Sequence, residues 1–314
     1  MKLTVSLIVH NDFSHIRAAL HSLRQTRTPF QAYVTINTGH VPEVDRLRTE
    51  FPEVVFRINE SPRGFAANHN AIMRMATSEF VGLLNDDIIL HDGALDTLVA
   101  YLDNHPETGL AGPRLFNADG TPQVSYYSDP GLLRMIYKIS GLAIITHQQS
   151  PVRRWLQRLK INRLLNVESL NPHPNTARPV PVIKGTVMVV RRKAYQQVGL
   201  MDETTLAYGE EVDWHWRLRQ AGWQVVFVPE AHVTHFGTSQ ATLRLTGRQL
   251  AEDRKAILNY YLKFRPFWQV MVIRCSIALS HSFWGLISLP LSWQQAQAHF
   301  RTAHLGITWQ REHG

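Results

Sequence analysis

Two adjacent carboxylates follow a short apolar segment in the first third of the chain. Residues 80–84 have the length and composition of a strand buried on both faces of a parallel sheet, and Asn85, Asp86 and Asp87 come directly after them. Open α/β sheets bind ligands beyond the carboxyl ends of their strands. Carboxylates there suit a hard cation such as Mg²⁺ or Mn²⁺, which proteins often hold with one or two carboxylates and substrate phosphates. A solvated turn is the alternative interpretation.

A second set of acidic residues stands at the predicted start of a helix. The segment Tyr208-Gly209-Glu210-Glu211-Val212-Asp213 opens a helical pattern that continues to about residue 221. A helix N-terminus stabilises an ionised carboxylate, and a positioned, ionised carboxylate can act as a general base. Capping of the helix is the alternative use of these residues.

Strand and helix patterns that alternate along the chain predict an α/β fold. Apolar runs predict strands near residues 3–9, 32–36, 54–58, 80–84, 182–190 and 223–228, with helices after the first, third and fourth of them. This order predicts a mostly parallel, doubly wound sheet with helices on both faces. A Gly-x-Gly-x-x-Gly segment after the first strand and a Walker loop are both missing. Their absence argues against a dinucleotide oxidoreductase and a P-loop enzyme.

The length and composition of the chain are those of an ordinary globular protein. Its 314 residues are 44% hydrophobic and 18% charged, which is enough for one large or two modest domains. The single cysteine, Cys275, cannot form an internal disulfide and fits a reducing compartment. We expect the N-terminal run to be a strand, because it continues into His10 without a small-residue cleavage site.

The net charge of +8 is concentrated in two segments. Residues 241–314 contain nine Lys or Arg against three Asp or Glu, and residues 151–180 contain six against one. No helix-turn-helix, zinc-finger, RNP or KH signature accompanies them, so nucleic acid is not an expected partner. An anionic membrane surface or a phosphorylated lipid explains the basic segments better.

Residues 241–314 predict a basic, amphipathic helical extension. Arg274 and His281 interrupt its most apolar part, residues 266–291, so the apolar run falls short of the roughly 20 residues that a spanning helix needs. A helix lying in the membrane interface is therefore expected, and a core or dimerisation helix pair is the alternative. Three tryptophans suit the headgroup zone: Trp268, Trp284 and Trp293.

Five short segments of the chain carry a family resemblance. They are Gly64-Phe65-Ala66-Ala67-Asn68-His69-Asn70, Leu84-Asn85-Asp86-Asp87, Gly185 with Arg191-Arg192 and Val198-Gly199, residues 208–213, and Pro229-Glu230-Ala231-His232-Val233-Thr234-His235. In this order and spacing they resemble a family 2 glycosyltransferase with the GT-A fold, and more narrowly its rhamnosyltransferase-like branch. The resemblance runs from the first strand to about residue 240.

The resemblance implies a GT-A catalytic domain over residues 1–240, with a donor half over about 1–120 and an acceptor half over about 121–240. Residues 241–314 then form the helical, membrane-associated extension. The implied enzyme is inverting and metal-dependent. It moves a hexose, rhamnose being the best guess, from a nucleotide-diphosphate sugar to a lipid-linked or polysaccharide acceptor in bacterial surface glycan synthesis. The implied location is the cytoplasmic face of the cell membrane, as a peripheral protein.

The resemblance also assigns roles on the donor side. Asp87 matches the last Asp of the family's Asp-x-Asp-type motif and is the first expected ligand of Mg²⁺ or Mn²⁺. His235 matches a histidine that closes the metal or diphosphate site in relatives, and His232, expected on the same side of that strand, is the alternative. Asn37 stands where relatives usually have an Asp. The residues expected to contact the nucleotide, diphosphate or sugar are His10, Asn11, Asn37, Arg63, Gly64, Asn70, Asn85 and Asp86.

On the acceptor side, the family takes its base from the second residue of a Glu-Asp pair at a helix start. Here the pair is Glu210-Glu211, so Glu211 is the expected base and Asp213 its rival. Lys184 and Thr186 are expected to face the acceptor or to lie in the core. Five cations are expected to meet a lipid pyrophosphate or to form a solvated helix face: Arg153, Arg154, Arg158, Lys160 and Arg163.

Other functions remain open at the level of the sequence. A non-catalytic, nucleotide-sugar-binding homologue is compatible with Glu211 and Asn37 in place of the family's aspartates. A membrane or nucleic-acid adaptor is compatible with the basic segments, and a sugar-nucleotide hydrolase is a third alternative. Turnover with and without acceptor separates these functions.

Overall fold

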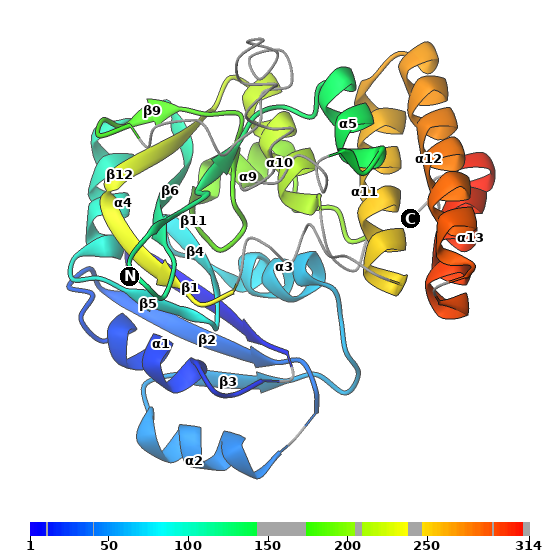
Figure 1. Cartoon of the computed structure of the whole chain (residues 1–314). Coiled ribbons are helices and arrows are strands. Elements are labelled where there is room, and N and C mark those ends of the chain that lie inside the picture. The colour runs from blue at the N-terminus through cyan, green and yellow to red at the C-terminus, as the bar shows by residue number, and fades with distance from the viewer. Residues whose placement is uncertain are drawn as a thin grey trace. The chain divides into compact units, whose positions relative to one another are not determined.

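The computed structural model describes residues 1–10, 12–39, 41–142, 174–204, 209–237, 247–290 and 292–309. The chain divides into two compact units, which Figure 1 shows in one view. We call the first the α/β unit (residues 1–127, 171–206 and 210–239) and the second the helical unit (residues 128–170, 207–209 and 240–314). The boundary near residue 240 between a catalytic domain and a helical extension stays a prediction.

A mixed sheet of ten strands within the described ranges forms the centre of the α/β unit (Figure 1). The strands are β1 (Leu3–Val9), β2 (Phe30–Ile36), β3 (Val55–Ile58), β4 (Phe80–Asn85), β5 (Ile88–Leu90), β6 (Thr108–Phe116), β7 (Pro122–Gln123), β9 (Arg178–Pro179), β11 (Val187–Arg191) and β12 (Gln224–His235). The order is β3-β2-β1-β4-β11-β6-β12-β5, with β7 on β6 and β9 on β12. A separate pair joins β8 (Tyr126–Tyr127) to β10 (Val182–Ile183).

The first four strands of that order run parallel, as predicted, and β11 runs antiparallel to both of its neighbours, β4 and β6. Side chains along β11 alternate between two cores. Val187 and Val189 pack on one face, and Met188 and Val190 on the other. A strand covered on both faces reads as a continuous apolar run, which explains why its sequence has no polar alternation.

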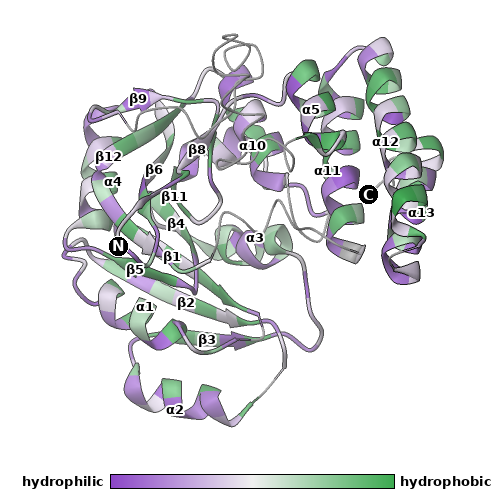
Figure 2. Ribbon diagram, viewed as in Figure 1, coloured by the Kyte–Doolittle hydropathy of each residue, from purple (hydrophilic) through white to green (hydrophobic). Residues whose placement is uncertain are grey.

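Helices cover both faces of the sheet, as the sequence predicted. On one face lie α1 (Ile16–Leu23), α2 (Pro42–Glu50) and α4 (Ala94–Asn104). On the other lie α3 (Phe65–Met75), α9 (Arg192–Val198) and α10 (Glu210–Gln220). Figure 2 shows the hydrophobic residues concentrated along the strands between these layers. The sheet is therefore rigidly supported, and its strand ends can hold side chains in fixed positions.

Several elements of the fold were not predicted, among them α2, β5, β6 and α5 (Leu132–Ile139). Helix α2 was missed because it is short and buries only Val44 and Leu47 within its bounds, too few positions to reveal a helical period. Strand β6 was missed although it is almost entirely buried, because its sequence contains Gly109, Gly112 and Pro113. The predicted strand over residues 182–190 is divided between β10 and β11, and Lys184-Gly185-Thr186 forms the connection.

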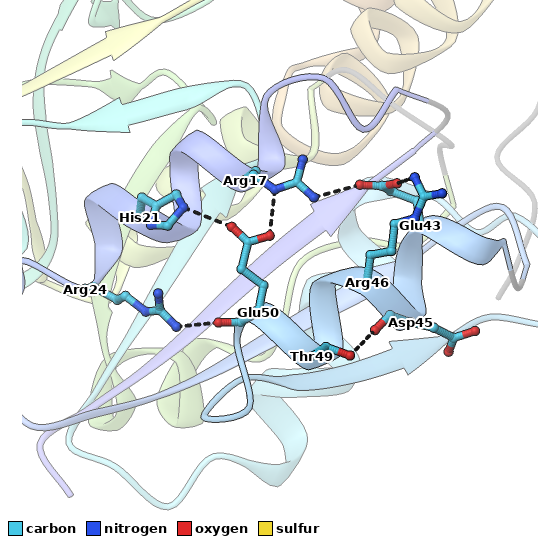
Figure 3. Close-up of polar contacts among 8 residues, drawn as sticks. All are labelled: Arg17, His21, Arg24, Glu43, Asp45, Arg46, Thr49 and Glu50. Carbon is cyan, nitrogen blue, oxygen red and sulfur yellow. Dashed lines mark hydrogen bonds and ion pairs between the residues drawn. The ribbon is translucent and has the colours of Figure 1, made fainter.

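Ion pairs on the surface join α1 to α2 (Figure 3). Glu50 accepts from Arg17 Nε at 2.7 Å and lies 3.0 Å from His21 Nε2, while Arg24 donates to its backbone carbonyl. Arg17 also contacts Glu43 at 3.0 Å. The Arg17 hydrogen bond is the main reason that the pKa of Glu50 lies below its ordinary value. These contacts fix the angle between the two helices beneath β2 and β3.

The helical unit contains α5 (Leu132–Ile139), α11 (Gly247–Phe264), α12 (Phe267–Ser288) and α13 (Trp293–Thr308). A chain of polar contacts runs through its interior. Lys138 bonds Asp253 at 2.8 Å, Asp253 pairs with Arg254, and Arg254 Nε donates to His281 Nε2 at 3.0 Å. His281 Nδ1 lies 3.0 Å from Nδ1 of His299. Buried polar groups that satisfy one another in this way fix the register of the helices around them.

Helix α12 is apolar on both sides: Val270, Ile273 and Ile277 are buried beside His281, and further apolar side chains are exposed. It is the one helix in the described part of the chain that is long and apolar enough to cross a membrane, by length and composition only. The expectation that Arg274 and His281 shorten the apolar run below a spanning length is therefore not supported. Figure 2 shows the apolar character of the helix. Its exposed, largely apolar residues recur every three or four positions: Trp268, Met271, Cys275, Leu279, Phe283 and Leu286.

Candidate donor and metal site

Three neighbouring parallel strands end at one edge of the α/β unit. His10 follows β1, Asn37 follows β2, and Asp86 and Asp87 follow β4. A backbone hydrogen bond of 2.8 Å from Asn37 N to the carbonyl of Val9 ties the first two strand ends together. The carboxyl edge of a parallel sheet is the usual ligand-binding edge of such folds. Four of the residues predicted from the sequence, His10, Asn37, Asp86 and Asp87, therefore lie at the same edge of the sheet.

Asp87 and His235 meet at this edge although 147 positions separate them. Asp87 Oδ1 lies 3.3 Å from His235 Nε2. The antiparallel pairing of β5 with β12 brings them together, since His235 pairs with Ile88 and Phe236 N donates to the Asp87 carbonyl at 2.9 Å. Burial raises the pKa of Asp87, but His235, a backbone N–H and Asn85 lower it more, so that it stays below its ordinary value.

The space around this pair fits a cation. Asp87 Oδ1 is buried and has no hydrogen-bond partner among the described residues. A Cβ atom on Gly237 would stand 2.7 Å from both Asp87 Oδ2 and His235 Nε2, so the glycine keeps this space free of a side chain. The described residues contain no group of three or more His, Cys, Asp or Glu side chains arranged for a metal. The pair thus suits a cation that takes its remaining ligands from phosphate and water.

Asp86 has a different environment from Asp87. Burial, and then the charge of Asp87, raise the pKa of Asp86 to about 7. Two adjacent carboxylates cannot both ionise cheaply in a partly desolvated place. A cation near Asp86 would reduce the repulsion between the two carboxylates. A sugar hydroxyl could instead form a hydrogen bond with the protonated Asp86. Asp86 is therefore suited to contact a ligand in either protonation state.

Asn37 is buried and its amide is fully used within the protein. Its Nδ2 donates to His10 Nδ1 at 3.0 Å and to the Arg63 carbonyl at 2.9 Å. Its Oδ1 accepts from Asn59 Nδ2 and from the Arg63 N–H, each at 2.8 Å, and from Asn68 Nδ2 at 3.2 Å. Asn37 therefore joins the segments that carry His10, Asn59 and Arg63, and both hydrogens of its amide are used within the protein.

Asn70 is likewise committed to the protein. Its Nδ2 donates to the Met201 carbonyl and to Glu203 Oε1, both at 2.8 Å, and its Oδ1 accepts from the Met201 N–H at 3.2 Å. Arg74 completes the contact by donating to Glu203 at 2.7 Å. Asn70 thus fastens α3 to the segment that follows α9. Arg63 and Gly64 stand before α3, and the Arg63 side chain is exposed.

The three acidic residues at the start of α10 have separate environments. Glu210 is buried, its Oε2 has no hydrogen-bond partner among the described residues, and burial, followed by the charge of Glu211, raises its pKa to about 8. Asp213 is buried and accepts from Arg217 Nε at 2.6 Å, and Arg217 also donates to the carbonyls of Val198 and Leu200. Glu211 is half-buried.

Comparison with known proteins identifies the family. Residues 20–252 match the family model described as "Glycosyltransferase like family 2". This chain belongs to glycosyltransferase family 2. The glycosyltransferase is similar to the N-acetylglucosaminyl-diphospho-decaprenol L-rhamnosyltransferase of Mycobacterium tuberculosis, at 32% identity over 190 residues, which are 60% of this chain and 57% of that protein. It is also 25% identical, over 74% of its length, to 42% of the pre-mycofactocin glycosyltransferase of the same organism.

Solved structures show the GT-A fold of the glycosyltransferase, as the sequence predicted. GalNAc-T7, described with UDP, GalNAc and Mn²⁺, superposes with a TM-score of 0.57 at 14% identity, over 98% of this chain and 56% of that one. The mannosyltransferase PcManGT of Pyrobaculum calidifontis, described with GDP-Man and Mn²⁺, gives 0.53 at 14% identity, over 99% and 88%. The glycosyltransferase spans little more than half the length of its mycobacterial rhamnosyltransferase relative.

Two residues beside Asp87 and His235 had no role on the donor side in the sequence-based prediction. Gln123 accepts from His235 Nδ1 at 2.7 Å and from Lys184 Nζ at 2.8 Å. Lys184 had been expected on the acceptor side or in the core, and burial lowers its pKa to about 8. The sequence predicts only a turn at Asn117-Ala118-Asp119-Gly120, and no local signal connects Gln123 with His235.

Other predicted residues of the glycosyltransferase are placed differently or lie outside the described residues. The ring of His232 packs against Phe116 and His91. It lies three positions before His235, and because side chains alternate along a strand the two do not share a face. The expectation that His232 replaces His235 is therefore wrong. The remaining expected residues lie outside the described ranges: Asn11, Arg153, Arg154, Arg158, Lys160 and Arg163.

Proposed function

We propose that this glycosyltransferase moves a hexose from a nucleotide-diphosphate sugar to a lipid-linked or polysaccharide acceptor, with inversion at the anomeric carbon. The observation that carries the proposal is the convergence of Asp87 and His235, 3.3 Å apart, at the carboxyl edge of the sheet. The name of the mycobacterial relative describes a rhamnosyltransferase and a diphospho-decaprenol acceptor. The name of this relative supports dTDP-rhamnose as the first donor to test and a polyprenyl diphosphate sugar as the first acceptor to test.

Asp87 and His235 would hold Mg²⁺ or Mn²⁺ together with oxygens of the donor diphosphate. When bound, the cation neutralises the charge that develops on the leaving diphosphate. The Mn²⁺ named in two solved neighbours supports this assignment. The ammonium of Lys184, 3.5 Å from His235 Nδ1, adds fixed positive charge on the same side of the site.

Glu211 is the proposed general base. Glu210 is suited to remain protonated near neutral pH, because burial raises its pKa to about 8. Asp213 serves a structural contact, since Arg217 holds its Oδ1 and joins it to the loop after α9. The family resemblance assigns the base to Glu211, which lies in the first turn of α10, from where a carboxylate can accept the acceptor's hydroxyl proton. Asp213 is then a positioning residue of that turn.

A membrane surface is the proposed location of the acceptor, on the cytoplasmic side. The exposed apolar stripe of α12 supports it, because a soluble protein rarely leaves such a stripe uncovered. Leu279 is 73% exposed and Leu286 61% exposed. The surrounding segment 241–314 contains nine Lys or Arg against three Asp or Glu, which favours anionic lipid. Peripheral binding is the proposed mode, and a span by α12 is the alternative.

A thermal-shift panel tests the donor site. Nucleotide diphosphates and nucleotide sugars, with and without Mn²⁺, are added to the wild type and to Asp87→Ala. A ligand that binds the folded state raises the melting temperature according to its concentration and affinity. We expect one donor to give a Mn²⁺-dependent shift that Asp87→Ala loses. Asp92→Ala, which removes an exposed carboxylate that pairs with Arg27, is the control and should keep the shift.

Transfer assays complete the test. Release of nucleoside diphosphate that depends on the acceptor identifies a transferase. Release without acceptor would indicate a sugar-nucleotide hydrolase, and binding without release would indicate a non-catalytic homologue. A folded wild type that responds to no nucleotide would refute the donor site.

A further inference from the structure

The buried side-chain amide of Gln123 contacts His235, Lys184 and Gly237, next to the Asp87–His235 pair. Gln123, at the end of β7, is 2% exposed. Its Oε1 accepts from Lys184 Nζ at 2.8 Å and from His235 Nδ1 at 2.7 Å. Its Nε2 donates to the carbonyls of His235 at 3.3 Å and Gly237 at 3.0 Å, and to Asn117 Oδ1 at 2.9 Å.

These partners allow only one orientation of the Gln123 amide. An ammonium has hydrogens to donate and no acceptor, so Lys184 must face the amide oxygen. Carbonyl oxygens only accept, so His235 O and Gly237 O must face the amide nitrogen. A rotation of the amide by half a turn would set donor against donor at Lys184 and acceptor against acceptor at the carbonyls of His235 and Gly237. The orientation is thus fixed by chemistry as well as by burial.

The fixed amide in turn fixes the tautomer of His235. An amide oxygen has no hydrogen to donate, so Nδ1 of His235 must carry the proton in the 2.7 Å contact. In the neutral ring the lone pair then lies on Nε2, the nitrogen 3.3 Å from Asp87 Oδ1. A histidine that binds a metal needs its other nitrogen held in this way, and the holding group sets both the tautomer and the ring direction.

We propose that Gln123 is the positioning residue of the cation site, presenting Nε2 of His235 to the cation and keeping the Lys184 ammonium beside it. The inference rests on the proposed function for the identity of the cation. It adds a residue that lies outside the five segments that carry the family resemblance. The same side chain also ties the backbone at Gly237, whose missing Cβ leaves the space between Asp87 and His235 open.

Two substitutions separate positioning from general packing. Gln123→Met keeps the length of the side chain and removes both polar ends. Gln123→Glu keeps an acceptor for His235 and Lys184 and removes the donor to the carbonyls. Gln31→Met is the matched control, because Gln31 also donates to backbone carbonyls, those of Ala32 and Glu53, away from this site. Circular dichroism and urea unfolding of all variants confirm that each is folded.

The first measurement needs no metal. Long-range ¹⁵N–¹H correlation spectra of the metal-free full chain, recorded at alkaline pH, report which ring nitrogen of His235 carries the proton. We expect the Nδ1–H form in the wild type, Gln31→Met and Gln123→Glu, and a mixture of forms in Gln123→Met. A His235 spectrum in folded Gln123→Met that matches the wild type would overturn the proposal.

The second measurement is Mn²⁺ affinity by electron paramagnetic resonance. Loss of an outer-shell partner of a metal-binding histidine typically lowers metal affinity about 10–100-fold, and we expect a loss of that size in Gln123→Met and none in Gln31→Met. Equal affinity of wild type and Gln123→Met refutes the positioning role while leaving the proposed function intact. A wild type that binds neither Mn²⁺ nor nucleotide refutes the proposed function, and the ring spectra then still decide what Gln123 does to His235.

Discussion

Side-chain amides form many of the hydrogen bonds around the candidate site. Asn37, Asn70 and Gln123 each use their amide oxygen and nitrogen inside the protein. An amide can accept and donate at once, so a single residue can join several chain segments. A sequence motif identifies such residues as part of a site but cannot tell contact with the ligand from support of the residues around it. The structure assigns the amides of Asn37 and Asn70 to support.

Asn37→Asp tests that assignment, because a carboxylate has no hydrogen for His10 or for the Arg63 carbonyl. Relatives of the family usually have an Asp at this position, so the change restores the commoner residue. We nevertheless expect it to lower the free energy of unfolding by about 1–3 kcal/mol, the usual cost of a buried polar group left without its partner, and to weaken nucleotide binding. Urea unfolding and calorimetry measure the two effects. Asn104→Asp, on the exposed end of α4, should change neither. An unchanged Asn37→Asp protein would contradict the supporting role.

Because the pKa of Glu210 is raised, we expect the stability of the protein to fall as pH rises. Its pKa is raised from 4.5 to about 8 in the folded state, so between these values the folded chain keeps a proton that the unfolded chain releases. Stability contributed by the protonated group is therefore lost as pH rises through this window. We expect Glu210→Gln to flatten the dependence and to stabilise the protein at pH 8 by on the order of 2 kcal/mol. Urea titrations across the window measure it, with the exposed Glu107→Gln as control. Parallel curves for wild type and Glu210→Gln would rule this out.

At the scale of elements, exposed ion pairs link α1 to α2, whose buried residues also lie in one hydrophobic core. Glu50 is the shared acceptor for Arg17 and His21. We expect Glu50→Gln to lower the melting temperature slightly at low salt and to have no effect at high salt, because exposed charges are screened. Thermal unfolding at two ionic strengths measures this, and Glu60→Gln, at an exposed position, is the control. A loss that is equal at both salt concentrations would mean that Glu50 acts through packing.

The elements also show which parts of the molecule the sequence predicts. Strands β1 and β4 were predicted almost to the residue, because strands buried on both faces are unbroken apolar runs. Asp87 and His235 were predicted through the family resemblance. Gln123 was not, since its role depends on the pairing of β7 with β6 and on residues more than fifty positions away. Long-range pairings of this kind leave no local period in the sequence.

At the scale of the whole molecule, both units bury apolar residues, but the helical unit also has a buried ion pair and an exposed apolar stripe. The α/β unit buries apolar residues on both faces of its sheet. The helical unit buries the ion pair of Asp253 with Arg254 and exposes apolar residues along α12. An apolar outer surface next to a basic sequence is typical of a protein that lies on an anionic bilayer.

Replacing Leu279 and Phe283 together with Gln tests that surface. Burial of a large apolar side chain contributes about 1.5–3 kcal/mol, so we expect the double variant to bind anionic vesicles at least about tenfold more weakly. Co-sedimentation with vesicles that contain phosphatidylglycerol measures it. Ile307→Gln, on α13 and 69% exposed, is the control for apolar exposure outside the stripe. Unchanged vesicle binding by the folded double variant would exclude α12 as the membrane contact.

The position of β11 in the middle of the sheet has a consequence for how the chain is made. Strand β4 ends at Asn85, but the strand that covers its free edge begins only at Val187. During synthesis the parallel half, β3-β2-β1-β4, is complete about a hundred residues before its neighbour leaves the ribosome. Until then β4 presents an unpaired apolar edge of the kind that recruits other chains. Nascent chains that stall within this interval are therefore the form of the protein most prone to aggregate, and the ones with most need of a chaperone.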